Sequence, residues 1–485
     1  MTIRVALLTL GCARNEVDSD GLAGRLVAAG YEIAAEPGRA DVVVVNTCGF
    51  IEAARAESVE TLLAARESNA GPVIAVGCMA QRHGVELAAA MPELDAVLGF
   101  DDYPEIADRI AAVVQGHRPA VPAPGDRRRL LPLSPVARQQ VARPAEPPRH
   151  RLDTGPVASV ALASGCDRHC TFCAIPSFRG SFISRPAAAV MAEVQSLVAT
   201  GVREVILVSE NTTSYGKDLG NPRLLEGLLA ELAGIDGLLR IRLAYLQPAE
   251  IRAELIEAMI STPRVANYFD LSFQHASPGV LRRMRRFGGA EAFLEIIDSI
   301  RDLAPAAGIR SNVIVGFPGE AVDDLDVLLS FLVEARLDAI GVFGYSAEEG
   351  TEAAGFADAL PEVEIASRVR TVSEVAEIVM AQRAQARVGE PGAVLLDSVG
   401  RRRGVDTNHV SADQGAHSGE GARRLLTAIG RAEHQGPEDS HTTITQPVGP
   451  SWAPGDLIDV RIVSSVGVDL VGAAMPADGS GRGSG

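Results

Sequence analysis

The sequence predicts an α/β protein of several domains: an N-terminal doubly wound parallel-sheet domain, a central partial TIM-like (β/α)6 barrel and a small C-terminal β-barrel. Three observations predict it. Strand-like apolar runs alternate with helical patterns in two long regions, a proline- and arginine-rich stretch separates these regions, and short strands among glycine-rich turns follow the second. A length of 485 residues also exceeds what one compact core usually organises.

The first predicted domain spans residues 1–115. Apolar strands are expected at 3–10, 41–46, 72–76 and 95–98. Helical patterns follow them at 18–29, 51–68, 82–90 and 103–115. Such alternation predicts a parallel sheet with helices on both faces. Residues 116–152 then lose all periodicity and mix prolines with arginines, which predicts an extended linker.

The second predicted domain spans residues 153–385. Strands are expected at 157–163, 204–209, 239–244, 267–273, 309–315 and 339–345. Helical stretches separate them, and an amphipathic helix at 362–387 closes the region. Six βα units in succession predict the partial TIM-like barrel.

The third predicted domain spans residues 386–475. Strands are expected at 393–399, 421–428, 442–446 and 457–463, which suits a small β-barrel. The stretch 406–419 is polar and reads as an insertion, and the Gly/Ser-rich tail 476–485 is expected to be disordered.

Composition narrows the class of protein. A formal charge of −17 argues against broad, nonspecific nucleic-acid binding and suits a basic partner such as a ribosomal protein. The apolar runs are strand-length, below the roughly 18 residues of a membrane span, so no membrane association is expected. The N-terminal apolar run is too short for a secretory signal, so a cytoplasmic location is expected.

One set of three cysteines lies close together in the sequence. Cys166, Cys170 and Cys173 directly follow the first barrel strand, where catalytic groups of such folds are found. Thiolates are the usual ligands of iron-sulfur clusters, and three of them leave one iron of a four-iron cluster open. The alternative is a structural zinc site with His169, but this residue is adjacent to Cys170, and neighbours rarely converge on one tetrahedral metal.

The other three cysteines are far apart in the sequence. Cys12, Cys48 and Cys78 each come just after a predicted strand, so a parallel sheet places them along one edge. Three convergent thiolates again suit a cluster with an open iron, and Gly11, Gly49 and Gly77 would relieve crowding beside it. The alternative is three separately buried cysteines in apolar strand ends.

The spacing Cys-x3-Cys-x2-Cys, with Phe172 before the last cysteine, resembles the signature of the radical S-adenosylmethionine superfamily. The resemblance implies that the open iron binds S-adenosylmethionine and that its reductive cleavage gives a 5′-deoxyadenosyl radical, with Phe172 beside the adenine. The run 312–320 resembles a later cofactor-contacting strand, which makes Gly316 and Glu320 candidate cofactor contacts. Gln274 and His275 end the fourth strand at the same mouth, and Gln274 is a further candidate cofactor contact.

Together, the two cysteine sets resemble the methylthiotransferases, which have an N-terminal cluster domain, a radical core and a TRAM barrel. The motifs at 46–54, 164–177, 274–277 and 343–351 resemble the branch called RimO, which modifies an aspartate of the twelfth small-subunit ribosomal protein. This implies two 4Fe-4S clusters, S-adenosylmethionine, an external electron donor and a sulfur source. It also implies transfer of a methylthio group to the aspartate β-carbon, with no catalytic residues beyond the cluster ligands.

The chain departs from that branch at three places. Glu210-Asn211 stands where a Gln-Asp pair is expected, Gln247 replaces a tyrosine, and Ala-Arg follows Cys12 in place of Pro-Lys. Two alternative functions stay open at this point. One is a tRNA adenosine methylthiotransferase, disfavoured by the acidic C-terminal region; the other is a non-catalytic iron-sulfur electron-transfer protein, for which the chain is excessively long.

Overall fold

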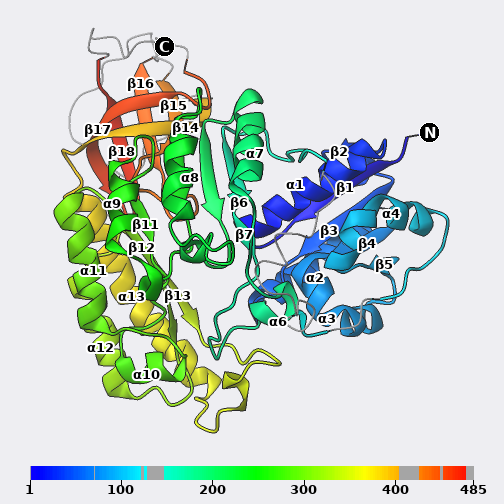
Figure 1. Ribbon diagram of the computed structural model, residues 1–485, viewed down its shortest axis with the longest axis horizontal. Coiled ribbons are helices and arrows are strands. Elements are labelled where there is room, and N and C mark those ends of the chain that lie inside the picture. The colour runs from blue at the N-terminus through cyan, green and yellow to red at the C-terminus, as the bar shows by residue number, and fades with distance from the viewer. Residues whose placement is uncertain are drawn as a thin grey trace, which may run out of the picture.

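The computed structural model describes residues 2–69, 71–121, 125–127, 147–402, 425–447 and 452–476 (Figure 1). The N-terminal sheet is wholly parallel and has the strand order β2-β1-β3-β4-β5. Its strands are β1 (Arg4–Thr9), β2 (Glu32–Ala34), β3 (Val42–Thr47), β4 (Val73–Val76) and β5 (Ala96–Val97). This is the doubly wound, flavodoxin-like order, so the predicted fold class of this region is confirmed.

Helices cover both faces of this sheet. Buried side chains of α1 (Ala13–Ala28) and α4 (Ile106–Val114) share one apolar core with it, and those of α2 (Glu52–Ser68) and α3 (Gly77–Ala90) share another. The expected start of α3 at residue 82 is wrong, because the helix follows β4 directly and Cys78 lies in its first turn. The short strand β2 was not expected, since its three residues carry no periodic pattern.

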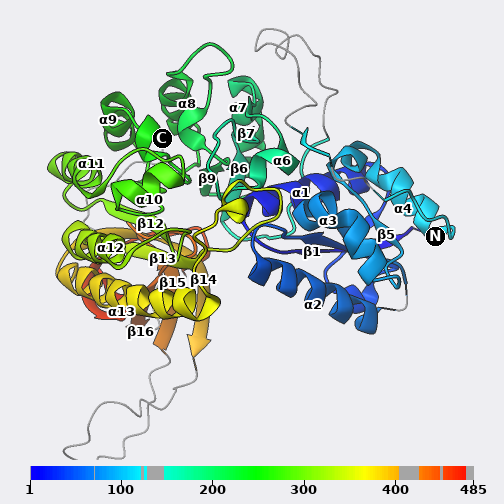
Figure 2. The same ribbon diagram turned by 90° about the horizontal axis from the view of Figure 1, so that it is seen from below.

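The central region is a parallel six-stranded partial barrel, as predicted (Figure 2). Its strands are β6 (Val157–Ala161), β9 (Glu204–Val208), β10 (Arg240–Leu243), β11 (Tyr268–Asp270), β12 (Gly308–Val315) and β13 (Ala339–Gly344). Two isolated parallel bridges, Ile241 with Val265 and Leu246 with Leu271, join the three-stranded halves beside β10 and β11. The outer helices are α7 (Ala187–Ala199), α8 (Leu224–Ala233), α9 (Ala253–Ser261), α11 (Ala290–Leu303), α12 (Val322–Ala335) and α13 (Glu362–Ala386).

Several short elements lie at the mouth of the barrel, which is the end where its strands have their carboxyl ends. They are a two-stranded antiparallel sheet of β7 (Ala163–Ser164) and β8 (Ile183–Ser184), the short helix α6 (Ile175–Arg179) between these strands, and α10 (Pro278–Arg283). The barrel core contains an aromatic cluster in which the ring of Phe273 lies 4.4 Å from that of Phe293 and 5.5 Å from that of Phe331. All three side chains are buried, so this part of the barrel core is tightly packed.

The N-terminal domain docks on the barrel through α1, which lies beside β6 in Figure 1. Val17 on this helix packs with Ala161, Ile206 and Val208 of the barrel strands. Arg149, within the predicted linker, is buried and binds Glu193 at 2.8 Å. Other parts of the predicted linker, 122–124 and 128–146, lie outside the described residues.

The C-terminal region is a closed barrel, as predicted, in the order β14-β15-β16-β18-β17. Its strands are β14 (Pro391–Arg402), β15 (Leu425–Arg431), β16 (Thr442–Pro447), β17 (Leu457–Val466) and β18 (Asp469–Ala474). Arg240 and Arg242 attach it to the base of the larger barrel, donating to the carbonyl oxygens of Ala393 and Glu433. The predicted insertion 406–419 and tail residues 477–485 lie outside the described residues.

Within the described ranges, no helix combines the length and the apolar character needed to cross a membrane.

Candidate functional site

The structure brings the first cysteine set to one edge of the N-terminal sheet. Cys12 precedes α1, Cys48 follows β3, and Cys78 lies in the first turn of α3. A side chain at Gly11 would come within 2.8 Å of Cys48 Sγ, so glycine is required there, and its φ of 88° also favours glycine. The predicted convergence of three strand ends is therefore present.

Asn15 connects these strand ends. It is fully buried, and its amide nitrogen donates to the carbonyl oxygens of Leu10, at 2.8 Å, and Thr47, at 3.3 Å. Its amide oxygen lies 3.5 Å from Cys78 Sγ. One side chain thus fixes the relative positions of the loops that carry the three thiols.

The thiols of this set differ in accessibility. Cys12 is exposed, whereas Cys48 and Cys78 are each 7% exposed. Burial raises the pKa of Cys48, and it raises the pKa of Cys78 to about 11 even though the nearby Arg179 lowers it. Iron bound at this set would therefore displace a proton from the Cys78 thiol, which is otherwise neutral at neutral pH.

The second cysteine set lies on the loop between β7 and α6, at the mouth of the barrel. The backbone N–H of Cys173 donates to the carbonyl oxygen of Cys170 at 3.2 Å, which makes a tight turn. Burial raises the pKa of Cys166 to about 11 and that of Cys173 well above its usual range. Arg286 approaches Cys170 Sγ to 3.8 Å, which places a positive charge beside the sulfur.

Each set fits a three-thiolate cluster site on the chemistry of its donors. None of the six cysteines is in a disulfide, and each set gathers three sulfurs close enough to influence one another's ionisation. Charged or buried polar groups lie beside a sulfur of each set, as iron-bound thiolates require.

The two sets lie on either side of the contact between the N-terminal domain and the barrel, where Ala174 and Phe178 pack against Cys78; we call this contact the seam. Helix α6 begins two residues after Cys173, and its Phe178 packs with Ala174 against Cys78. Arg179, at the end of α6, donates to Cys78 Sγ at 3.2 Å. The helix that follows the loop of Cys166, Cys170 and Cys173 therefore forms one wall of the first site.

A buried carboxylate lies in the same seam. Among the described residues, neither oxygen of Glu210, which follows β9, has a hydrogen-bond partner, and burial raises its pKa. Its carboxylate forms longer ion pairs with Arg179, at 3.8 Å, and with Arg14, at 4.0 Å. Arg14 and Glu210 are two of the departures noted in the sequence, and the structure shows that they face each other as an ion pair.

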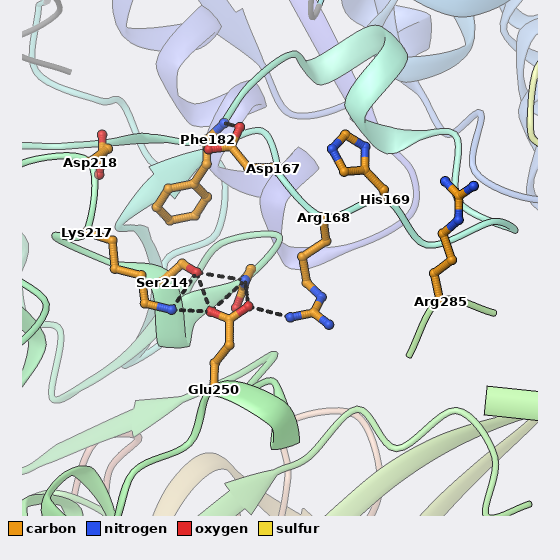
Figure 3. Close-up of a pocket in the computed structure, with 10 residues that line it drawn as sticks. Asp167, Arg168, His169, Phe182, Ser214, Lys217, Asp218, Glu250 and Arg285 are labelled. Atoms are coloured by element: carbon orange, nitrogen blue, oxygen red, sulfur yellow. Dashed lines mark hydrogen bonds and ion pairs between the residues drawn. The ribbon is translucent and has the colours of Figure 1, made fainter. Parts of the chain in front are cut away.

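A cavity of about 530 Å³ opens beside the second set (Figure 3). Asp167, Arg168 and His169, between the first two cysteines of that set, line one side of it. On the other side, Glu250 accepts hydrogen bonds from Arg168 and Lys217, both at 2.5 Å. The cavity therefore offers a polar, charge-balanced wall directly against the cysteine loop.

The other predicted contacts lie around the same mouth. Phe172 packs against a small apolar cluster that includes Phe317. Gly316 lies against Ile365 of α13, and a side chain at this position would come within 2.7 Å of that residue. The carboxylate of Glu320 is already engaged by the backbone N–H groups of Gly316 and Phe317 and by Arg368, so it builds the turn. Gln274 is half-buried and has a left-handed φ of 72°.

His275 is buried in the same region. Its Nδ1 accepts the backbone N–H of Ser277, and its Nε2 lies 3.6 Å from Glu320. These partners fix the ring in place. Whether Phe172, Gly316, Glu320 and Gln274 contact a cofactor stays a prediction.

A second link joins the domains above the first set. Glu348, on the loop after β13, binds Arg55 of α2 at 2.5 Å and Arg82 of α3 at 2.8 Å. Arg82 also donates to the carbonyl oxygen of Gly49, beside Cys48. Sequence reasoning missed Arg179, Asn15 and Glu348, because no local pattern indicates which residues meet across the seam.

Comparison with known proteins agrees with this geometry. Residues 4–99 match the model of the uncharacterized protein family UPF0004, and residues 160–332 match the Radical SAM superfamily. A curated ribosomal protein uS12 methylthiotransferase RimO from Streptomyces avermitilis is 51% identical over 97% of this chain and 97% of its own length. RimO from a Nocardioides species is 53% identical over 96% of each chain.

Among solved structures, the radical S-adenosylmethionine methyltransferase TsrM from Kitasatospora setae has a TM-score of 0.52 and 15% identity, covering 70% of this chain and 73% of its own. That likeness concerns the fold. The names of these two curated relatives carry neither alternative function considered from the sequence. With about half of its residues identical to theirs over nearly its whole length, the chain belongs to the RimO family of ribosomal protein uS12 methylthiotransferases, within the Radical SAM superfamily.

Proposed function

We propose that this enzyme adds a methylthio group to the β-carbon of an aspartate in the ribosomal protein uS12. The observation that carries the proposal is the presence of two sets of three free cysteines on either side of one packed seam. The family relationship and the match of the motifs support the substrate. The proposed location is the cytoplasm, where such a substrate and reduced thiols are both found.

Cys166, Cys170 and Cys173 would hold one 4Fe-4S cluster with S-adenosylmethionine, and Cys12, Cys48 and Cys78 would hold the other. When bound, these groups supply a radical able to take hydrogen from an unactivated C–H bond and a methylated sulfur to replace that hydrogen. An external electron donor and a sulfur source are required in addition. No acid–base side chain of this protein would remove the hydrogen, because the C–H bond at the aspartate β-carbon is too weakly acidic for a side-chain base.

The protein's own residues position these groups and keep water away. Asn15 fixes the loops of the first set, and α6 fixes the second set against it. Glu348 and Arg82 close the domain boundary above the first set. These contacts hold the two cysteine sets in one relative position. Groups bound at them would therefore react at a high effective concentration.

Anaerobic reconstitution with iron and sulfide tests this proposal. Two clusters correspond to about eight iron atoms per chain. Replacing all three cysteines of either set by alanine should halve the iron. Only the loss of Cys166, Cys170 and Cys173 should also abolish reductive cleavage of S-adenosylmethionine. Iron near about four atoms per chain in the unmodified protein would contradict the second cluster.

A further inference from the structure

The guanidinium of Arg179 is aimed at the first cysteine set from the domain that carries the second. Its Nη2 lies 3.2 Å from Cys78 Sγ and 3.0 Å from Asn15 Oδ1. Its Nη1 donates to Asp18 at 2.7 Å. Because an arginine carries several N–H donors, this one side chain contacts all three acceptors.

The guanidinium of Arg179 is buried. The Arg179 side chain is 6% exposed, and its guanidinium carbon lies 4.7 Å from the centre of the Phe100 ring. A buried charge is unfavourable unless partners compensate for its lost hydration. Asp18 lies at hydrogen-bond distance, and Glu210 is 3.8 Å away. Because the guanidinium is shielded from water, its hydrogen bond to the Cys78 sulfur is stronger than the same bond would be in water.

A hydrogen bond from a cation to a cluster thiolate has a defined consequence. The reduction potential of an iron-sulfur cluster depends on its net charge, on hydrogen bonds to its sulfurs and on exposure to solvent. A nearby positive charge stabilises the reduced, more negative state. The contact also comes from α6, so it depends on correct docking of the loop that carries the second set.

We infer that Arg179 is a positioning residue of the first cluster and raises the reduction potential of that cluster through its hydrogen bond to Cys78. Because Arg179 lies on α6, it also couples this cluster to the loop that carries Cys166, Cys170 and Cys173. This inference rests on the proposed function, because it assumes that Cys12, Cys48 and Cys78 hold a cluster. It adds a role for a residue outside both cysteine sets.

The test uses the full chain with Cys166, Cys170 and Cys173 replaced by alanine, so that only the first site can hold iron. Anaerobically reconstituted protein is assayed for iron and then titrated redox-chemically while its electron paramagnetic resonance signal is followed. Arg179→Met removes the charge and Arg179→Lys keeps it. We expect a more negative midpoint potential for Arg179→Met and a potential close to that of the parent for Arg179→Lys.

Arg149→Met is the matched control. Arg149 is 11% exposed and binds Glu193 and the carbonyl oxygen of Ser159, so its loss weakens domain docking without removing a contact to sulfur. Its potential should equal that of the parent. If Arg179→Met loses its iron, the inference is supported by an Arg179→Lys variant that retains iron at the parental potential.

Four results would overturn the inference. They are an unchanged potential in an iron-loaded Arg179→Met variant, loss of iron from both Arg179 variants, an equal shift in Arg179→Lys, and an equal shift in the Arg149→Met control. A parent protein that binds no iron at the first set is a different failure, since it refutes the proposed function itself.

Discussion

Glu348 connects the two domains above the first cysteine set, and its removal should loosen that connection. Its side chain is 5% exposed, and that of its partner Arg82 is 7% exposed. Removing one partner of such a buried pair costs about 3–5 kcal/mol, because the other charge stays buried without its counter-charge. The pair with Arg55, whose side chain is 25% exposed, adds about 1 kcal/mol or less.

We therefore expect Glu348→Ala to destabilise the docked arrangement by about 3–5 kcal/mol. Hydrogen exchange followed by mass spectrometry measures this directly, because local opening exposes the peptides 49–56 and 344–352. A cost of that size corresponds to roughly 100-fold faster exchange or more in these peptides. Glu352→Ala is the control, since its pair with Arg285 is exposed and worth about 0–1 kcal/mol. Equal exchange in the two variants would refute the reasoning.

Three further predictions concern pH, thiol reactivity and the core. Burial alone raises the pKa of Glu250, but hydrogen bonds from groups including Lys217 bring it down from 4.5 to about 2. The stability it confers is therefore complete above pH 4.5 and lost as the pH falls toward about 2, and denaturation curves should lose this component in Glu250→Gln. In iron-free protein, iodoacetamide should label exposed Cys12 much faster than buried Cys78; equal rates would contradict the described edge. Phe273→Ala should cost about 3–5 kcal/mol of unfolding free energy, and a change below about 1 kcal/mol would show that the aromatic cluster is not a packed core.

The sequence allowed much of the architecture to be predicted, because period and spacing are local properties. The βα alternation led to both parallel sheets, and the position of Cys12, Cys48 and Cys78 after strands led to their shared edge. The start of α3 was placed too late, since Gly77 and Cys78 are not typical of a helix start.

Contacts across the seam could not be predicted in this way. Arg179 is separated from Cys78 by about a hundred residues, and only the docking of α6 brings them together. The hydrogen bonds by which the backbone N–H groups of Gly316 and Phe317 hold the Glu320 carboxylate were likewise not predicted, and a cofactor contact of Glu320 stays a prediction. The departures at Arg14 and Glu210 looked unrelated until the structure placed their side chains 4.0 Å apart.

The central claim is transfer of a methylthio group to uS12, and mass spectrometry of that protein tests it most directly. Purified uS12, or small ribosomal subunits, would be incubated anaerobically with the reconstituted enzyme, S-adenosylmethionine, a sulfide source and a reductant. The account predicts one peptide in which a methylthio group replaces a hydrogen on an aspartate, and no such product when either cysteine set is changed to alanine. An unchanged uS12 peptide, from an enzyme that holds both clusters and cleaves S-adenosylmethionine, would contradict it.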